Sequence, residues 1–135
     1  LFAAVCMVSG GLFAGEHEDA LRKGLDENKP IVLYFYSKHC TYCDKMDREV
    51  FLDKEIAGTL KNKMVYLRVD VDKETYLSSL YNVRGYPTTW LLEPAGKHIA
   101  QVPGYIPKRE FKKILTYLQG QHYKHMGLGE FLRRK

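Results

Sequence analysis

The chain has 135 residues, of which 45% are hydrophobic and 27% are charged, and it carries a net charge of +5. This length is enough for one domain with a buried core, and the composition excludes intrinsic disorder. The basic residues Arg133, Arg134 and Lys135 are not accompanied by a groove-reading motif, so nucleic acid is not an expected partner.

The first segment, residues 1–14, is apolar and uncharged and does not start with methionine. It is typical of the hydrophobic region of a secretory signal peptide, with Leu12-Phe13-Ala14 as an imperfect cleavage site. Fourteen residues are too few to span a bilayer, although a longer original segment could form an anchor. An apolar helix packed on the domain is the alternative. We expect a truncated signal peptide or anchor, and therefore a periplasmic or otherwise exported protein.

The next elements are predicted from the spacing of hydrophobic residues. Residues 16–28 are predicted to form an amphipathic helix, and the apolar run 31–36 is predicted to be a buried strand. Apolar side chains recur at helical spacing through residues 41–60. Asp53 is a candidate N-cap for a new helical segment, so we expect this helix to kink or split near Leu52.

The second half of the chain is predicted to alternate strands and helices before it ends in a hairpin and further helices. The expected elements are a strand at 64–72, a helix at 73–81, hairpin strands at 88–93 and 98–102, a helix at 107–119 and a short helix within 122–135. The helix at 73–81 places Tyr76, Leu77 and Leu80 on one side. Pro107 suits the first position of the later helix, and Gly120 is expected to end it.

This order of elements predicts an α/β fold. The early strands alternate with helices and should therefore be parallel, whereas the hairpin adds an antiparallel edge. We expect a central mixed sheet of about four strands flanked by helices, with a C-terminal helical extension. The expected division is a signal peptide or anchor at 1–14, one domain at 15–120 and a basic helical tail at 121–135.

Two cysteines, Cys40 and Cys43, lie where the first predicted strand is followed by a helix. A cysteine at the start of a helix is close to unpaired backbone N–H groups and the positive end of the helix dipole, which favour the reactive thiolate. Lys38 and His39 add positive charge on the approach side. Because Cys43 follows one turn later on the same face, the two sulfurs could form a disulfide with little backbone movement.

A metal site is the main alternative for this pair. Three cysteines in all, the third being Cys6, are too few for a four-cysteine zinc site or an iron–sulfur cluster. A zinc site completed by His122 and His125 stays open, although these histidines are about eighty residues away. A binding or delivery site for a soft metal such as Cu(I) also stays open, with Met46 as the only nearby candidate ligand.

The order of elements, the CxxC after the first core strand and the later Tyr86-Pro87-Thr88 resemble the thioredoxin superfamily over residues 16–120. The segments most similar to exported bacterial thioredoxin-like proteins are 34–40, 44–51 and 102–105. These proteins include the sulfur-oxidation-associated thioredoxins and the C-terminal domain of the transmembrane thiol-disulfide reductant carrier. The final stretch from Tyr123 to Phe131 is similar to the tail of the former group.

The resemblance implies a thiol-disulfide oxidoreductase without a cofactor, in which Cys40 is the nucleophile and Cys43 the resolving thiol. Pro87 should be cis and lie beside the disulfide, with the Tyr86 backbone available to pair with a bound substrate. A partner's cysteine-bearing segment is expected on the apolar surface formed by His39, Tyr42, Tyr86 and Tyr105. The implied substrates are protein or small-molecule disulfides, reduced in the periplasm.

The same resemblance suggests which molecules this protein interacts with, and it shows two positions at which the sequence departs from the thioredoxin pattern. We expect protein thiols and disulfides, an upstream thiol electron donor and, as a candidate, a membrane redox protein as its partners. The chain itself is expected to be a monomer.

Tyr34 stands where many thioredoxins have a buried aspartate, and Arg68 stands at the position of its partner lysine. Tyrosine is a poor base at neutral pH, so water, Glu49 or Asp70 are the candidates for deprotonating Cys43.

Overall fold

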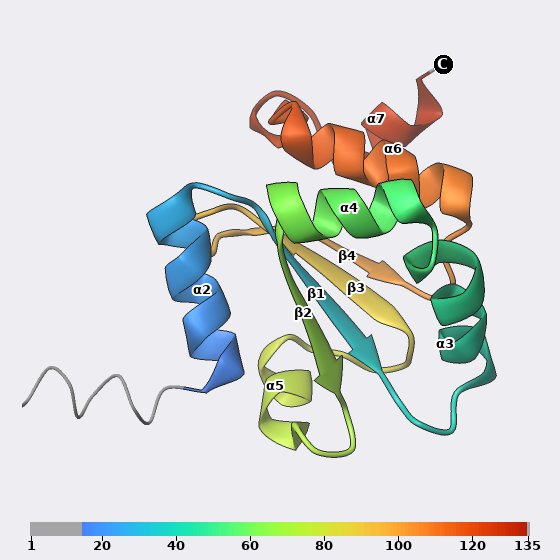
Figure 1. The fold of residues 1–135 in the computed structure, drawn as a ribbon. Helices are drawn as coiled ribbons and strands as arrows, with labels where there is room; N and C mark the ends of the chain where they lie inside the picture. The colour runs from blue at the N-terminus through green and yellow to red at the C-terminus, as the bar shows by residue number, and fades with distance from the viewer. Residues whose placement is uncertain (1–14, 135) are drawn as a thin grey trace, which may run out of the picture.

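The computed structural model describes residues 15–134, so the predictions about a signal peptide or anchor and about Cys6 concern residues outside it. Figure 1 shows a twisted sheet with helices on both of its faces. In chain order the elements are α2 (Glu16–Glu27), β1 (Ile31–Tyr36), α3 (Thr41–Met46), the π-helix η1 (Asp47–Phe51), α4 (Lys54–Lys63), β2 (Val65–Asp70), α5 (Thr75–Leu80), β3 (Thr88–Leu92), β4 (His98–Pro103), α6 (Lys108–Gln119), the 3-10 helix η2 (His122–Lys124) and α7 (Leu128–Arg133). Within residues 15–134 we find no helix that combines the length and the hydrophobicity of a membrane span.

The four strands form one mixed sheet in the order β2–β1–β3–β4. β1 and β2 are parallel, because the chain crosses from one to the other through α3 and α4, and Tyr34 pairs with Arg68 in this register. β3 runs antiparallel to β1, and β4 runs antiparallel to β3 as the second strand of a hairpin. The predicted α/β class, the parallel strands and the antiparallel hairpin are confirmed.

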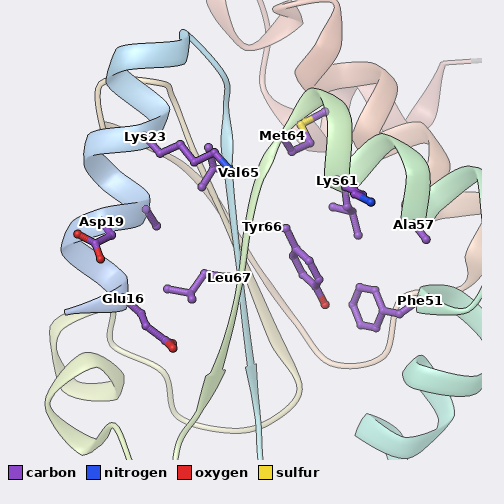
Figure 2. Close-up of a pocket in the computed structure, with 12 residues that line it drawn as sticks. Glu16, Asp19, Lys23, Phe51, Ala57, Lys61, Met64, Val65, Tyr66 and Leu67 are labelled. Carbon is purple, nitrogen blue, oxygen red and sulfur yellow. The ribbon is translucent and has the colours of Figure 1, made fainter. Parts of the chain in front are cut away.

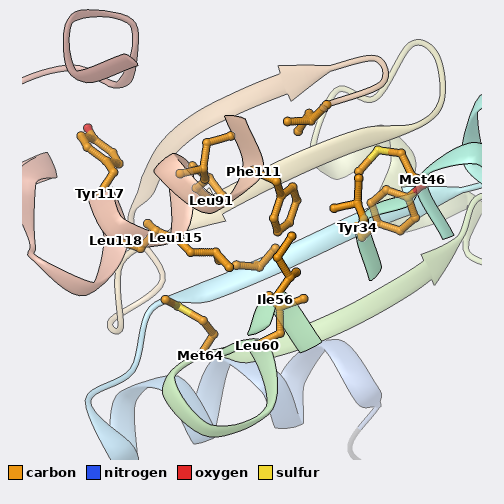
Figure 3. Close-up of a cluster of buried hydrophobic side chains, with 14 residues drawn as sticks. Tyr34, Met46, Ile56, Leu60, Met64, Leu91, Phe111, Leu115, Tyr117 and Leu118 are labelled. Carbon is orange, nitrogen blue, oxygen red and sulfur yellow. The ribbon is translucent and has the colours of Figure 1, made fainter. Parts of the chain in front are cut away.

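Both faces of β1 are buried, and this explains its unbroken hydrophobic run. Side chains alternate along a strand, so Val32 and Tyr34 join one hydrophobic cluster while Ile31, Leu33 and Phe35 join another. Figure 3 shows the first cluster, which lies between the sheet and the helices α3, α4 and α6. The second cluster lies under α2 and α5. The sheet is therefore held rigidly between two layers of packed side chains.

The helix after the cysteines is interrupted, as predicted, but the interruption has a form that the sequence does not indicate. α3 passes directly into the π-helix η1, and the chain then leaves helical geometry near Leu52. Asp53 caps α4, since its carboxylate accepts a hydrogen bond of 3.1 Å from the Ile56 N–H. A π-turn widens the helix by one residue, and such turns are frequent at functional sites.

The remaining helices differ from the prediction only in detail. In α5, Leu77 is buried whereas Tyr76 and Leu80 are exposed, because a six-residue helix is too short to present a long inward face. Pro107 precedes α6 as its N-cap instead of forming its first residue. The predicted buried stripe of α6 is present and consists of Phe111, Ile114, Leu115 and Leu118.

The C-terminal extension packs against the domain, as Figure 1 shows for α7 beside α6. It consists of η2 and α7 in place of one short helix. The Tyr117 hydroxyl of α6 donates a hydrogen bond of 2.8 Å to the Met126 carbonyl oxygen and ties the extension to the core. The partly buried side chains that it contributes are Tyr123, Met126, Leu128, Phe131 and Leu132.

Candidate active site

The two cysteines lie at the transition from β1 to α3, where the sequence places them. Cys40 is the N-cap of α3 with an extended backbone, and Cys43 lies in the first turn of that helix. The two residues form a disulfide, with their Cα atoms 5.2 Å apart. The structure is therefore that of the oxidised form, and the pair predicted to exchange disulfides is within bonding reach without rearrangement of the helix.

The environments of the two sulfurs differ. The Cys43 N–H, at the start of α3, points at the Cys40 sulfur over 3.1 Å. Such a contact stabilises negative charge on Cys40 and so favours its thiolate after reduction. Cys40 has 9% of its surface exposed and Cys43 only 2%. Cys40 is thus the more exposed residue of the pair.

The Tyr86–Pro87 peptide bond lies beside the disulfide and is cis. The Tyr86 carbonyl oxygen is 3.7 Å from the Cys40 sulfur. The loop is held by the Gly104 N–H, which donates to the Pro87 carbonyl oxygen over 2.7 Å; the φ of +89° at Gly104 is a conformation that favours glycine. Among residues 15–134 the Tyr86 N–H has no hydrogen-bond acceptor, so it is free to pair with an added strand.

The surface around the disulfide is aromatic. Tyr42, Tyr86 and His39 are exposed there. Tyr105 joins them, because its ring lies 6.4 Å from that of Tyr42 and its hydroxyl donates to the Glu49 carboxylate. The site is thus an apolar patch on the surface of the molecule.

A pocket of the described residues lies away from the disulfide. It measures about 540 Å³ and opens between α2 and α4 along the outer edge of β2, as Figure 2 shows. Its walls include Lys23, Phe51 and Leu67 but neither cysteine. This pocket is therefore separate from the disulfide.

Tyr34 and Arg68 are the two residues at which the sequence departs from the usual thioredoxin pattern. Tyr34 is fully buried, its hydroxyl has no hydrogen-bond partner among residues 15–134, and burial raises its pKa. Arg68 extends from β2 to Asp47, at the junction of α3 and η1. The two candidates for deprotonating Cys43 are engaged elsewhere: Glu49 accepts from the Tyr105 hydroxyl, and the Asp70 carboxylate accepts from the Asp72 N–H.

The described residues give no specific support to a metal site. Met46 is fully buried within the hydrophobic cluster, so it serves the core of the protein. Among residues 15–134 no three histidine, cysteine, aspartate or glutamate side chains come together. His122 packs against Tyr117 and Phe131 in the C-terminal extension.

Comparison with known proteins agrees with the fold and the site. A family model described as a thioredoxin-like domain matches residues 17–119. A thioredoxin of Mycoplasmoides gallisepticum is 35% identical over 91 residues, which cover 67% of this chain and 86% of the relative. Protein disulfide-isomerase 1 of Dictyostelium discoideum is 26% identical over 119 residues, and the match covers 87% of this chain but 31% of that protein.

Solved structures show the same relationship. The solution structure of a thioredoxin from Thermus thermophilus superposes with a TM-score of 0.66 at 30% identity, covering 80% of this chain and 93% of the other. A thioredoxin-fold protein from Helicobacter pylori reaches a TM-score of 0.70 at 20% identity, covering 79% and 84%, and this likeness shows the fold alone.

Proposed function

Because this chain belongs to the thioredoxin-like family, we propose that it is a thiol-disulfide oxidoreductase that reduces disulfides, with Cys40 as the attacking thiol and Cys43 as the resolving thiol. The observation that carries this assignment is the Cys40–Cys43 disulfide at the start of α3. Its more exposed sulfur receives a backbone N–H and faces the Tyr86–Pro87 loop.

The reaction takes place in two exchanges at sulfur. The Cys40 thiolate first attacks a substrate disulfide; a bond forms between Cys40 and one substrate sulfur, and the other substrate sulfur leaves and takes up a proton. Cys43 then loses its proton and attacks Cys40, so that the Cys40–Cys43 disulfide forms and the second substrate sulfur leaves and takes up a proton. The substrate gains two electrons and two protons, which the enzyme dithiol supplies.

Substrate recognition follows from the exposed groups around Cys40. The free Tyr86 N–H supports pairing with an extended segment, in the manner of an added strand. His39, Tyr42, Tyr86 and Tyr105 supply the apolar surface on which side chains next to the substrate cysteine would pack. Protein disulfides are accordingly the favoured substrates, and small-molecule disulfides can reach the same sulfur.

The reducing direction and the exported location are further parts of the proposal. The direction is supported by the similarity to thioredoxins, and it requires an upstream thiol donor that returns the disulfide to the dithiol. A periplasmic or otherwise exported location is supported by the apolar, uncharged sequence of residues 1–14. A membrane redox protein is a suitable donor for such a location.

Substitution of each cysteine tests the proposed reaction. Cys40→Ser should abolish the reduction of a model peptide disulfide, because no thiolate remains to attack. Cys43→Ser should stop after the first exchange and accumulate a mixed disulfide, which intact-mass measurement detects. Normal turnover by the Cys43→Ser variant would overturn the two-cysteine reaction.

A further inference from the structure

A charge pair connects the helix that carries the cysteines to the sheet below it. The Arg68 guanidinium of β2 donates two hydrogen bonds to the Asp47 carboxylate, Nη1 to Oδ1 over 2.9 Å and Nη2 to Oδ2 over 3.2 Å. Its Nη1 also donates to the Tyr66 hydroxyl over 3.1 Å. Such two-fold contact fixes both the distance and the orientation of the two charges.

Aromatic rings surround this pair on the inner side. The guanidinium carbon lies 5.2 Å from the centre of the Tyr34 ring, 4.8 Å from that of Tyr36 and 5.5 Å from that of Phe51. The π-turn η1 contributes Phe51 to this cluster. The rings cover one side of the guanidinium, while the side chains of Arg68 and Asp47 keep 34% and 43% of their surface exposed, so water screens the pair in part.

The acidic member of the pair lies one helical turn from the resolving cysteine. Asp47 follows Cys43 by four residues, and the Asp47 N–H donates to the Cys43 carbonyl oxygen. Residues four apart share a helix face, with their Cβ atoms about 5–6 Å from each other. Asp47 therefore lies on the same face of α3 as Cys43, one turn further on, and its carboxylate is paired there with the Arg68 cation.

On the basis of the proposed exchange reaction, we propose that Asp47 and Arg68 are positioning residues that set the proton affinity of the Cys43 thiol. The Asp47 carboxylate opposes ionisation of Cys43, and Arg68 offsets that effect. The balance between the two charges decides how readily Cys43 becomes a thiolate when the mixed disulfide has formed, and thus how fast the substrate is released.

Other titratable groups surround the pair. Burial raises the pKa of Tyr34, and it raises the pKa of Tyr66 to about 12, so both hydroxyls stay protonated. Tyr36 lies on β1 beside the guanidinium, and Asp44 is an exposed residue of α3. The Asp70 carboxylate, at the end of β2, is bound to the Asp72 N–H.

The test measures the pKa of the Cys43 thiol directly, in the 135-residue chain that carries Cys40→Ser. With ¹³C-labelled cysteine, the Cβ signal of Cys43 is assigned by its loss in Cys43→Ser and followed through a pH titration. Asp47→Asn should lower the thiol pKa by about one pH unit, and Arg68→Gln should raise it by about one unit. The double variant should lie close to the parent protein, because both charges are removed together.

If Asp47→Asn and Arg68→Gln shift the Cys43 pKa in opposite directions, the pair acts through its charges and not through the position of α3. A pair that only held α3 in place would shift the Cys43 pKa in the same direction in both variants, or not at all, and either result would overturn the proposal. Asp19→Asn and Arg22→Gln, which break an exposed pair at 3.8 Å on α2, should leave the pKa unchanged. If Arg68→Gln does not fold, the comparison of Asp47→Asn with Asp19→Asn decides alone.

This titration is independent of the proposed enzymatic reaction. A wild-type protein that failed to reduce disulfides would contradict the proposed function even if both pKa shifts were observed. Conversely, a normally active protein without the two shifts would contradict the role of the charge pair alone.

Discussion

At the scale of single residues, Tyr34 and Tyr117 form a natural comparison. Both are fully buried members of the same hydrophobic cluster. The Tyr117 hydroxyl donates to the Met126 carbonyl oxygen over 2.8 Å, whereas the Tyr34 hydroxyl has no partner among residues 15–134. Burying a hydroxyl without a hydrogen bond costs free energy, so these two groups should have opposite effects on stability.

Removal of each hydroxyl tests this expectation. Tyr34→Phe should leave the free energy of unfolding unchanged or raise it by about 1 kcal/mol, because a desolvated and unpaired group is deleted. Tyr117→Phe, the matched control, should lower it by about 1 kcal/mol, because the Met126 carbonyl loses its donor. Urea unfolding of both variants at neutral pH provides the measurement. A loss for Tyr34→Phe as large as that for Tyr117→Phe would show that the Tyr34 hydroxyl is stabilising.

The contacts of the site could be predicted from the sequence to different degrees. The closeness of Cys40, Cys43 and Tyr86 was predictable, because a CxxC motif and a later Tyr-Pro pair occur in the order that the family resemblance requires. The contact between Asp47 and Arg68 was not predictable. These two residues are 21 positions apart, and only the packing of α3 on the sheet brings them together.

At the scale of secondary structure elements, local sequence determines the strands better than the helix ends. The β1 strand has the predicted bounds, since a short β-prone run leaves little choice when both faces are buried. The π-turn η1 has no signature in residue type or spacing, because it depends on the tertiary packing of Phe51. Leu77 packs inward from α5 and Leu80 does not, a difference set by the orientation of a single short helix.

The N-cap of α4 gives a prediction about pH. The backbone N–H of Ile56 lowers the pKa of the Asp53 carboxyl below its usual value, and Lys112 and Lys108 act in the same direction. A lowered folded-state pKa means that Asp53 stabilises the protein above its unfolded-state value, about pH 4, and that this contribution is lost as the pH falls through the folded-state value.

Asp53→Asn keeps an oxygen for the cap but removes the charge. This variant should therefore be less stable than the wild type at pH 7, and the difference should shrink when the pH is lowered well below about 4. Urea unfolding at the two pH values gives the comparison, and Asp26→Asn, at an exposed position of α2, is the control. A difference that stayed constant with pH would contradict the assigned role of the Asp53 charge.

At the scale of the whole molecule, the fold places the disulfide after the carboxyl end of β1, an inner strand of the sheet, with exposed aromatic side chains next to it. The direction in which such a pair transfers electrons depends on how strongly the Cys40 thiolate is stabilised. The difference between a thioredoxin-like and a strongly oxidising couple is about 150 mV, or roughly 7 kcal/mol. One backbone N–H from Cys43 and the position of Cys40 at the start of α3 contribute to this stabilisation.

The reduction potential of the Cys40–Cys43 pair tests this account most directly. It can be measured by equilibrating the protein in glutathione and dithiothreitol buffers, after a check for bound metal. We predict a value of about −270 mV or below, in the range of thioredoxin. A value of about −120 mV, in the range of strong oxidants, would contradict the reducing role and identify the protein as a disulfide donor.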